Sequence, residues 1–169
     1  VVNIDWDMHP DNSLIFDFGV GLNQPGMVWT EYWPLHAPGD RLKTAGSGPG
    51  LDHGYQVMRL HADSTYCFWT MVLGDPNGVG PLSQNDPPPI SSIIAGSFHT
   101  GPLPAGLQDV SLTSMAGSPT HDLALFDHND ENYRGMAALD QAARIVWYYE
   151  QDTEGEHHGD VFAINQKEN

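Results

Sequence analysis

The sequence predicts an all-β protein, in which a two-sheet β-sandwich over residues 1–101 precedes a short set of antiparallel strands over residues 108–169. Two observations support this prediction. Apolar and polar residues alternate along several short segments, which is the pattern of strands with one buried face. Thirteen Pro and eighteen Gly interrupt those segments, as expected where many short strands are joined by turns. A chain of 169 residues has room for one small domain and part of another.

The first three strands follow from this alternation. It runs over residues 2–8, breaks at residues 9–12 and resumes over residues 14–20. Residues 24–26, Gln-Pro-Gly, predict a turn that leads into a third strand at residues 27–33. These segments therefore read as a hairpin followed by a separate strand.

The rest of the sandwich is less regular. Residues 38–54 are rich in Gly and polar residues and predict a long exposed loop or a weak edge strand. Large side chains on both faces of residues 66–72 indicate a central strand, and residues 90–98 form the last predicted strand. Two prolines in residues 102–107 predict a stiff extended linker, which places the domain boundary there.

A seven-residue motif identifies the type of sandwich. The segment from Leu60 to Tyr66 resembles the Leu-x-Pro-x-Thr-x-Tyr tyrosine corner of fibronectin type III and immunoglobulin-like domains, with Ala62 in place of Pro and Ser64 in place of Thr. In such a corner the tyrosine ring packs in the core, and its hydroxyl bonds the backbone a few residues upstream. The resemblance gives Leu60 and Tyr66 structural roles.

A second motif lies near the end of the chain. Residues 138–150 predict a hairpin, with a polar turn from Asp140 to Arg144 and a second strand reading Ile-Val-Trp-Tyr-Tyr-Glu. This hairpin resembles the opening of the β-propeller in bacterial and archaeal arylsulfotransferase-like proteins, which often carry a small sandwich before the propeller. Ala143 departs from the pattern, because such turns usually have Gly there to adopt a positive φ, so we expect a different turn geometry.

The resemblance implies that the chain is the front of a larger protein or a processed piece of one. A further strand is predicted at residues 161–164, and another would be needed to finish a four-stranded blade. The histidine that accepts the sulfuryl group in these enzymes lies further along the propeller, so this portion is expected to lack catalysis. Its expected partners are the remainder of a parent protein or neighbouring subunits, including other copies of the chain in a homo-oligomer.

Charge excludes several other partners. With 22 Asp and Glu against 6 Lys and Arg, the formal net charge of −16 repels nucleic acid and anionic membrane surfaces. No apolar run is long enough for a membrane span. The first residue is Val1 rather than Met, which indicates either a processed N-terminus or a truncation. Composition and resemblance together predict a secreted, periplasmic or cell-surface location.

Adjacent histidines near the C-terminus are the first candidate for chemistry. Neutral imidazole is a common metal ligand and proton shuttle, and the resemblance would let His157 or His158 face the central channel of the propeller, where substrate enters. Neighbouring residues of a strand point to opposite faces, so both can face one ligand only in a loop. The alternative is a solvated loop before the strand at residues 161–164.

A calcium loop is the second candidate. Oxygen side chains recur at alternate positions in Asp127, Asn129 and Glu131, which resembles the start of such a loop. However, Asn132 stands where the loop glycine is expected, and no glutamate closes the loop. A polar surface turn without any cofactor is therefore the favoured interpretation.

Tryptophan and cysteine offer weaker signals. Five Trp could form an exposed row that stacks on sugar rings, although core positions are the commoner fate, and Trp33 is the one expected to be partly exposed. Cys67 is the only cysteine, so no internal disulfide forms, and an inert buried thiol is expected. Carbohydrate binding and an adhesive sandwich that assembles by strand addition are thus the alternatives to the arylsulfotransferase-like interpretation.

Overall fold

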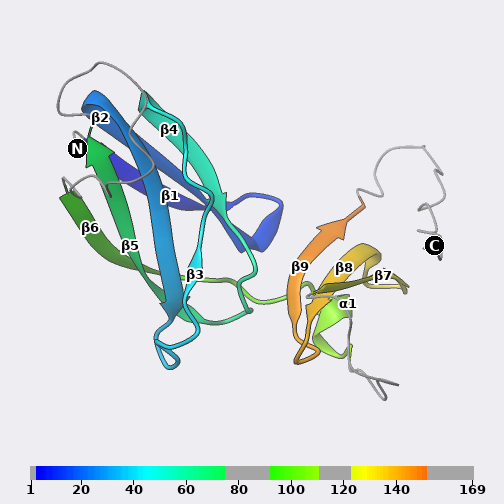
Figure 1. Cartoon of the computed structure of the whole chain (residues 1–169). Helices are drawn as coiled ribbons and strands as arrows, with labels where there is room; N and C mark the ends of the chain where they lie inside the picture. Colours follow the sequence, from blue (N-terminus) through cyan, green and yellow to red (C-terminus); the bar gives the residue numbers. More distant parts are fainter. Residues whose placement is uncertain (1–2, 75–91, 111–122, 152–169) are drawn as a thin grey trace, which may run out of the picture.

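A computed structural model describes residues 3–74, 92–110 and 123–151, and it confirms the all-β prediction (Figure 1). The described residues form two antiparallel sheets, one of them strongly curled. The first sheet contains β1 (Asn3–His9), β2 (Asn12–Pro34), β3 (Leu42–Lys43), β4 (Gly50–Val57), β5 (Thr65–Gly74) and β6 (Ser92–His99). The second sheet contains β7 (Leu123–Asn129), β8 (Arg134–Asp140) and β9 (Ile145–Glu150), and the short helix α1 (Ala105–Gln108) precedes it in the chain.

The long strand β2 organises the first sheet. One of its edges pairs with β4 and then β3, while the other pairs with β1 up to Gly21 and with β5 from Gly26 onward. The predicted turn at residues 24–26 is therefore wrong, because the chain continues as strand through it. Pro25 is tolerated because residues 22–25 lie in a register shift, where β2 changes partners and a missing N–H costs no ladder hydrogen bond.

The change of partners lets the sheet curl onto itself and enclose a core of aromatic rings. Trp6 of β1 packs edge-to-face on Phe68 of β5, with ring centroids 5.0 Å apart. Phe16 of β2 lies 4.2 Å from Phe98 of β6 by the same measure. Strands that are distant along the sheet thus face each other, as the two layers of a sandwich do.

The glycine-rich segment from residue 38 to residue 54 contains more strand than the sequence indicates. Leu42 and Lys43 form the short edge strand β3, in line with the weak edge strand expected there. Gly50–Val57, by contrast, is a full strand, β4, whose residues pair with β2 from Phe16 to Gly26. Local composition misses β4 because the partner edge of β2, rather than intrinsic propensity, holds it in place.

The second sheet packs directly against the first. Residues 102–107 were predicted to be an extended linker, but Ala105–Gln108 forms the helix α1. Leu107 is fully buried, and Gly106 packs so closely on Tyr133 that a Cβ there would lie 2.5 Å from the Tyr133 Cβ. The connection is therefore part of the packed interior.

No helix in residues 3–74, 92–110 or 123–151 has the length and hydropathy needed to cross a membrane.

Candidate functional site

The predicted tyrosine corner is one wall of the junction between the two sheets. Leu60 and Tyr66 are buried, and the Tyr66 hydroxyl accepts a hydrogen bond from the His61 backbone N–H at 2.9 Å. Thr100 closes the corner, because its hydroxyl donates to the His61 carbonyl at 2.6 Å and accepts from the Ser64 N–H at 2.9 Å. The chain around His61 is thus fixed from two sides, which sets the direction of the His61 side chain.

The β8–β9 turn forms the opposite wall, and Asp140 holds it together. Asp140 Oδ1 accepts from the backbone N–H groups of Ala142 and Arg144, both at 2.9 Å. Asp140 Oδ2 lies 2.9 Å from Arg144 Nε and 2.8 Å from Arg144 Nη2. Ala143 takes a φ of 62°, so the expectation of a different turn geometry at this position is wrong. The hydrogen bonds of Asp140 offset the strain of a left-handed non-glycine residue.

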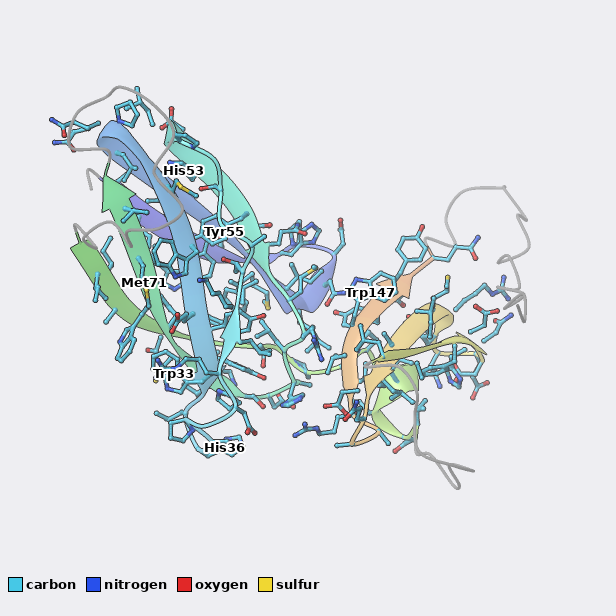
Figure 2. The ribbon with its side chains drawn as sticks, viewed as in Figure 1. Trp33, His36, His53, Tyr55, Met71 and Trp147 are labelled. Carbon is cyan, nitrogen blue, oxygen red and sulfur yellow. The ribbon has the colours of Figure 1, made fainter. Side chains whose placement is uncertain are left out.

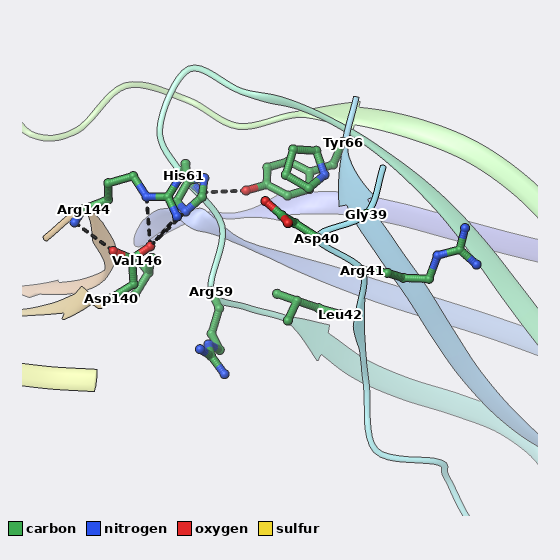
Figure 3. A pocket seen from close by; sticks show the side chains of 11 residues that line it. Gly39, Asp40, Arg41, Leu42, Arg59, His61, Tyr66, Asp140, Arg144 and Val146 are labelled. Atoms are coloured by element: carbon green, nitrogen blue, oxygen red, sulfur yellow. Dashed lines mark hydrogen bonds and ion pairs between the residues drawn. The ribbon is translucent and has the colours of Figure 1, made fainter. Parts of the chain in front are cut away.

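A contact between His61 and Asp140 links these two walls. His61 Nε2 lies 3.3 Å from Asp140 Oδ2, and the His61 and Asp140 side chains retain only 20% and 12% of their exposure (Figure 3). Burial, followed by the charge of Arg144, lowers the pKa of His61 despite the favourable contact with Asp140. Burial acts to raise the pKa of Asp140, but the hydrogen bonds and charge of Arg144 outweigh it and hold that pKa below its ordinary value. Near neutral pH the contact is therefore a hydrogen bond from neutral His61 to a carboxylate.

A cavity of about 240 Å³ opens beside this pair. Its lining includes Asp40, Arg59 and Tyr66 in addition to the linked residues (Figure 3). Arg59 is exposed and has a positive φ of 65°, whereas Arg41 is turned away from His61 in the close view. Among the described residues, no Ser, Thr or Cys lines this cavity. The His61–Asp140–Arg144 arrangement is a polar contact between the two sheets.

A Ser–His pair occurs elsewhere in the sandwich. Ser47 Oγ lies 2.7 Å from His53 Nδ1, and His53 Nε2 lies 3.0 Å from the Gly50 carbonyl. Because a carbonyl only accepts, Nε2 carries the proton and Nδ1 accepts from Ser47. Ser47 Oγ also accepts from the Val28 N–H at 3.2 Å, and the His53 side chain is buried. This pair ties the β3–β4 connection to β2, and sequence reasoning missed it because the two residues lie in what reads as loop.

The predicted calcium residues lie on and after β7. Asp127 and Asn129 are exposed at the end of β7, and Asn129 Oδ1 accepts from Arg134 Nε at 3.0 Å. The carboxylate that organises this turn is Asp130, which accepts from the N–H groups of Asn132 and Tyr133, each at 2.7 Å. Glu131 is exposed in the same turn. Within the described ranges, no group of three or more His, Cys, Asp or Glu side chains is arranged to hold a metal ion.

The histidine, tryptophan and cysteine candidates from the sequence differ in where they lie. His157 and His158 lie outside the described residues. Trp33 was expected to be partly exposed, but only 9% of it is accessible, because the Arg41 guanidinium lies 4.4 Å from its ring and Trp69 packs edge-to-face on it. Cys67 is half-buried on the same outer face rather than fully buried.

Cations cover the outer tryptophans of the sandwich. Arg41 also lies 4.6 Å from the Trp69 ring and is paired with Glu31 at 3.3 Å, while Lys43 Nζ lies 4.7 Å from the Trp29 ring. Each cation occupies a ring face on which a sugar would stack. A carbohydrate would have to displace them, so this surface gives no support to sugar binding.

No family model, curated protein or solved structure matches this chain.

Proposed function

We propose that this chain is the N-terminal, non-catalytic portion of an extracytoplasmic arylsulfotransferase-like protein, in which the sandwich holds the first strands of a propeller. The observation that carries the proposal is a hydrophobic core cluster shared by the two sheets. One cluster of buried side chains joins Leu14 and Phe16 of β2 to Ala137, Leu139 and Tyr148 of the second sheet. Because burial of apolar surface drives folding, two sheets with one core stabilise each other.

Polar contacts at β9 support the same role. The Asn12 side-chain amide donates to the Tyr148 carbonyl at 2.5 Å, and the Ser13 N–H donates to the Tyr148 hydroxyl at 2.8 Å. The start of β2 therefore satisfies the backbone of β9 and fixes the second sheet in position. A sandwich that holds a strand by such hydrogen bonds is better suited to interdomain or subunit contacts than to catalysis.

The test is the mass of the intact polypeptide in its native host. A chain that continues well beyond Asn169, with recurring strand-turn-strand patterns, is the expected result. A natural polypeptide with the mass of residues 1–169 alone would contradict the proposal.

An adhesive subunit that assembles by strand addition is the second candidate, and the β7 edge favours it. Among the described strands β7 pairs only with β8, and Leu123 and Leu125 are 43% and 47% exposed. An exposed apolar edge strand is a template for pairing with another chain.

Sedimentation analysis across a range of protein concentrations tests this candidate. Assembly that is abolished by Leu125→Lys, but retained by Leu35→Lys at an exposed loop position of the sandwich, would favour the adhesive role. A monomer at all concentrations would remove it.

A further inference from the structure

The strand β6 lies at an edge of the first sheet. Among the described strands it pairs only with β5, and it forms the margin of the sheet beyond β5 (Figure 1). Thr100, which follows β6, donates its backbone N–H to the Ser64 carbonyl at 3.0 Å, so residue 100 faces β5. Residues of an antiparallel strand alternate between bonding one neighbour and pointing away from it. The backbone N–H and C=O groups of Ile93, Ala95 and Ser97 therefore point away from β5.

The residues with outward backbone groups carry small or apolar side chains. Ile93 is 56% exposed, and Ala95 and Ser97 are exposed as well. Met71, the β5 partner of Ile93, is buried and lies beside β6 (Figure 2). Ile93 therefore borders an apolar side chain of β5, and a further strand on its other side would continue that apolar surface.

The strand β6 lacks the charged side chains that usually keep edge strands from pairing with other chains. No Asp, Glu, Lys or Arg occurs from residue 87 to residue 108, although the chain has 22 acidic residues. Every other described strand at a sheet edge carries at least one charge: Asp5 and Asp7 in β1, Lys43 in β3, Asp52 in β4, Asp127 in β7 and Glu150 in β9. Of these described edges, β6 alone has no charged side chain to oppose a further strand.

The net charge decides which partner suits this edge. A basic partner would be attracted to the carboxylates elsewhere on the surface, and β6 offers it none. A second copy of a chain with a net charge of −16 is repelled by most of that surface and can approach where carboxylates are absent. An antiparallel edge is also self-complementary, because a two-fold axis can pair the same strand from two copies.

We propose that β6 pairs antiparallel with β6 of a second copy, so that the first sheet continues across a two-fold axis. The outward N–H and C=O groups of Ile93, Ala95 and Ser97 then bond the same strand of the second copy. A contact along one edge strand is small, so the dimer is reversible and depends on protein concentration. This contact is distinct from strand addition at β7, and it holds whether or not the natural chain continues beyond Asn169.

Sedimentation velocity of residues 1–169 over a range of protein concentrations, at about 20 mM and about 500 mM NaCl, measures the dimer. The expected result is a reversible dimer that is tighter at the higher salt concentration, because salt screens the repulsion between two acidic chains. A dimer that weakens at the higher salt concentration, as a contact made by ion pairs does, would overturn the proposal. A monomer under all these conditions would overturn it as well.

Substitutions of Ala95 test the edge itself. Ala95→Pro removes an outward N–H and leaves the hydrogen bonds to β5 in place, so it should weaken the dimer about tenfold or more. Ala95→Ser keeps that N–H and is the matched control, which should form the dimer as the wild type does. Ala95→Glu places a carboxylate on the edge and is a second disruptive variant that leaves the backbone unchanged. Leu125→Lys, at the β7 edge, should leave the dimer unchanged.

Amide hydrogen exchange, carried out at high and at low protein concentration and read by NMR, locates the contact. The N–H groups of Ala95 and Ser97 should exchange more slowly at the high concentration, because pairing with the second copy protects them. The N–H groups of Ile94 and Phe98 face β5 and are the internal controls, which should be protected at both concentrations. Exchange at Ala95 that does not depend on concentration, or a dimer that persists in both Ala95→Pro and Ala95→Glu, would overturn the proposal.

Discussion

At the scale of single residues, two positions show how a side chain or a backbone angle fixes the junction. Ala143 holds a φ of 62° in the β8–β9 turn, a conformation that glycine adopts without cost. Tyr66 is 1% exposed and holds the backbone of His61 through its hydroxyl. The backbone of Ala143 is strained, whereas the buried Tyr66 hydroxyl has its hydrogen-bond partner. Replacing Ala143 by Gly should therefore raise the free energy of unfolding, and replacing Tyr66 should lower it.

Ala143→Gly should stabilise the protein by about 0.5–1 kcal/mol, because relief of the left-handed strain exceeds the added entropy of the unfolded chain. Urea unfolding measures the change. Ala142→Gly in the same turn is the matched control, since Ala142 has no positive φ, and it should be neutral or destabilising. If the two glycine variants behave alike, the strain at Ala143 is not a factor in stability.

Tyr66→Phe should cost about 0.5–1.5 kcal/mol through the lost hydrogen bond, and Tyr66→Ala about 3–5 kcal/mol through the lost packing as well. Tyr149→Phe, at a side chain that is 55% exposed, is the control and should stay within about 0.5 kcal/mol of the wild type. Unchanged denaturation midpoints for both Tyr66 variants would remove its role as an anchor.

At the scale of elements, β2 pairs with strands in both halves of the curled sheet, and close packing between strands holds the two halves together. Thr30 of β2 hydrogen-bonds Thr70 of β5 at 2.6 Å and Tyr55 of β4 at 2.7 Å, so one buried polar chain spans three strands. On β6, Gly96 leaves room for the Phe68 ring, since a Cβ there would lie 2.4 Å from Phe68 Cζ. The strands fit because a missing side chain on one matches a large ring on its neighbour.

Gly96→Ala should therefore destabilise the protein by about 1–3 kcal/mol, because the Phe68 ring would have to leave its place in the core. Gly54→Ala is the matched control, since a Cβ at that strand position would meet no atom within 4 Å. Thermal unfolding followed by circular dichroism compares the two. Equal melting temperatures for both variants would show that Phe68 repacks freely.

At the scale of the whole molecule, a shared core, the Asn12 and Ser13 contacts and the His61–Asp140 pair join the sheets. Sheets of few strands are marginal in water when isolated. The strands of residues 123–151 therefore depend on the sandwich for their stability. Acid and the loss of a core side chain should both weaken this junction.

Acidification should destabilise the protein partly through His61. Its pKa in the folded protein lies below the ordinary value of 6.5, so the unfolded chain binds that proton more tightly. The contribution of neutral His61 is complete above pH 6.5 and decreases as the pH falls through that value. Asp140 acts in the same direction only below its ordinary pKa of 3.8.

The free energy of unfolding in urea, measured at pH 7.5 and pH 5.5, tests this dependence. We expect the wild type to lose more stability between those two values than His61→Gln, which keeps a hydrogen-bond donor toward Asp140. His99→Gln, at an exposed histidine of β6, should behave as the wild type does. An equal loss in His61→Gln and the wild type would assign the dependence to other histidines.

Loss of the Tyr148 side chain should release the second sheet. Tyr148→Ala removes a buried ring of the shared core together with its hydrogen bond to the Ser13 N–H. Limited proteolysis at low protein concentration should then cleave the variant at sites C-terminal to Pro104 earlier than it cleaves the wild type, while the sandwich stays intact. Simultaneous digestion of both parts would show that the two sheets unfold as one unit.

The sequence by itself determined the all-β class, the β1–β2 hairpin, the tyrosine corner from Leu60 to Tyr66 and the hairpin around residues 140–144. Each of these depends on local alternation or on a short motif with its own turn chemistry. Tertiary structure decided the rest. It carried β2 through Pro25, turned residues 50–57 into a strand and brought His61 to Asp140. These features depend on partners that are distant in the chain, and a pattern of neighbouring residues contains no record of such partners.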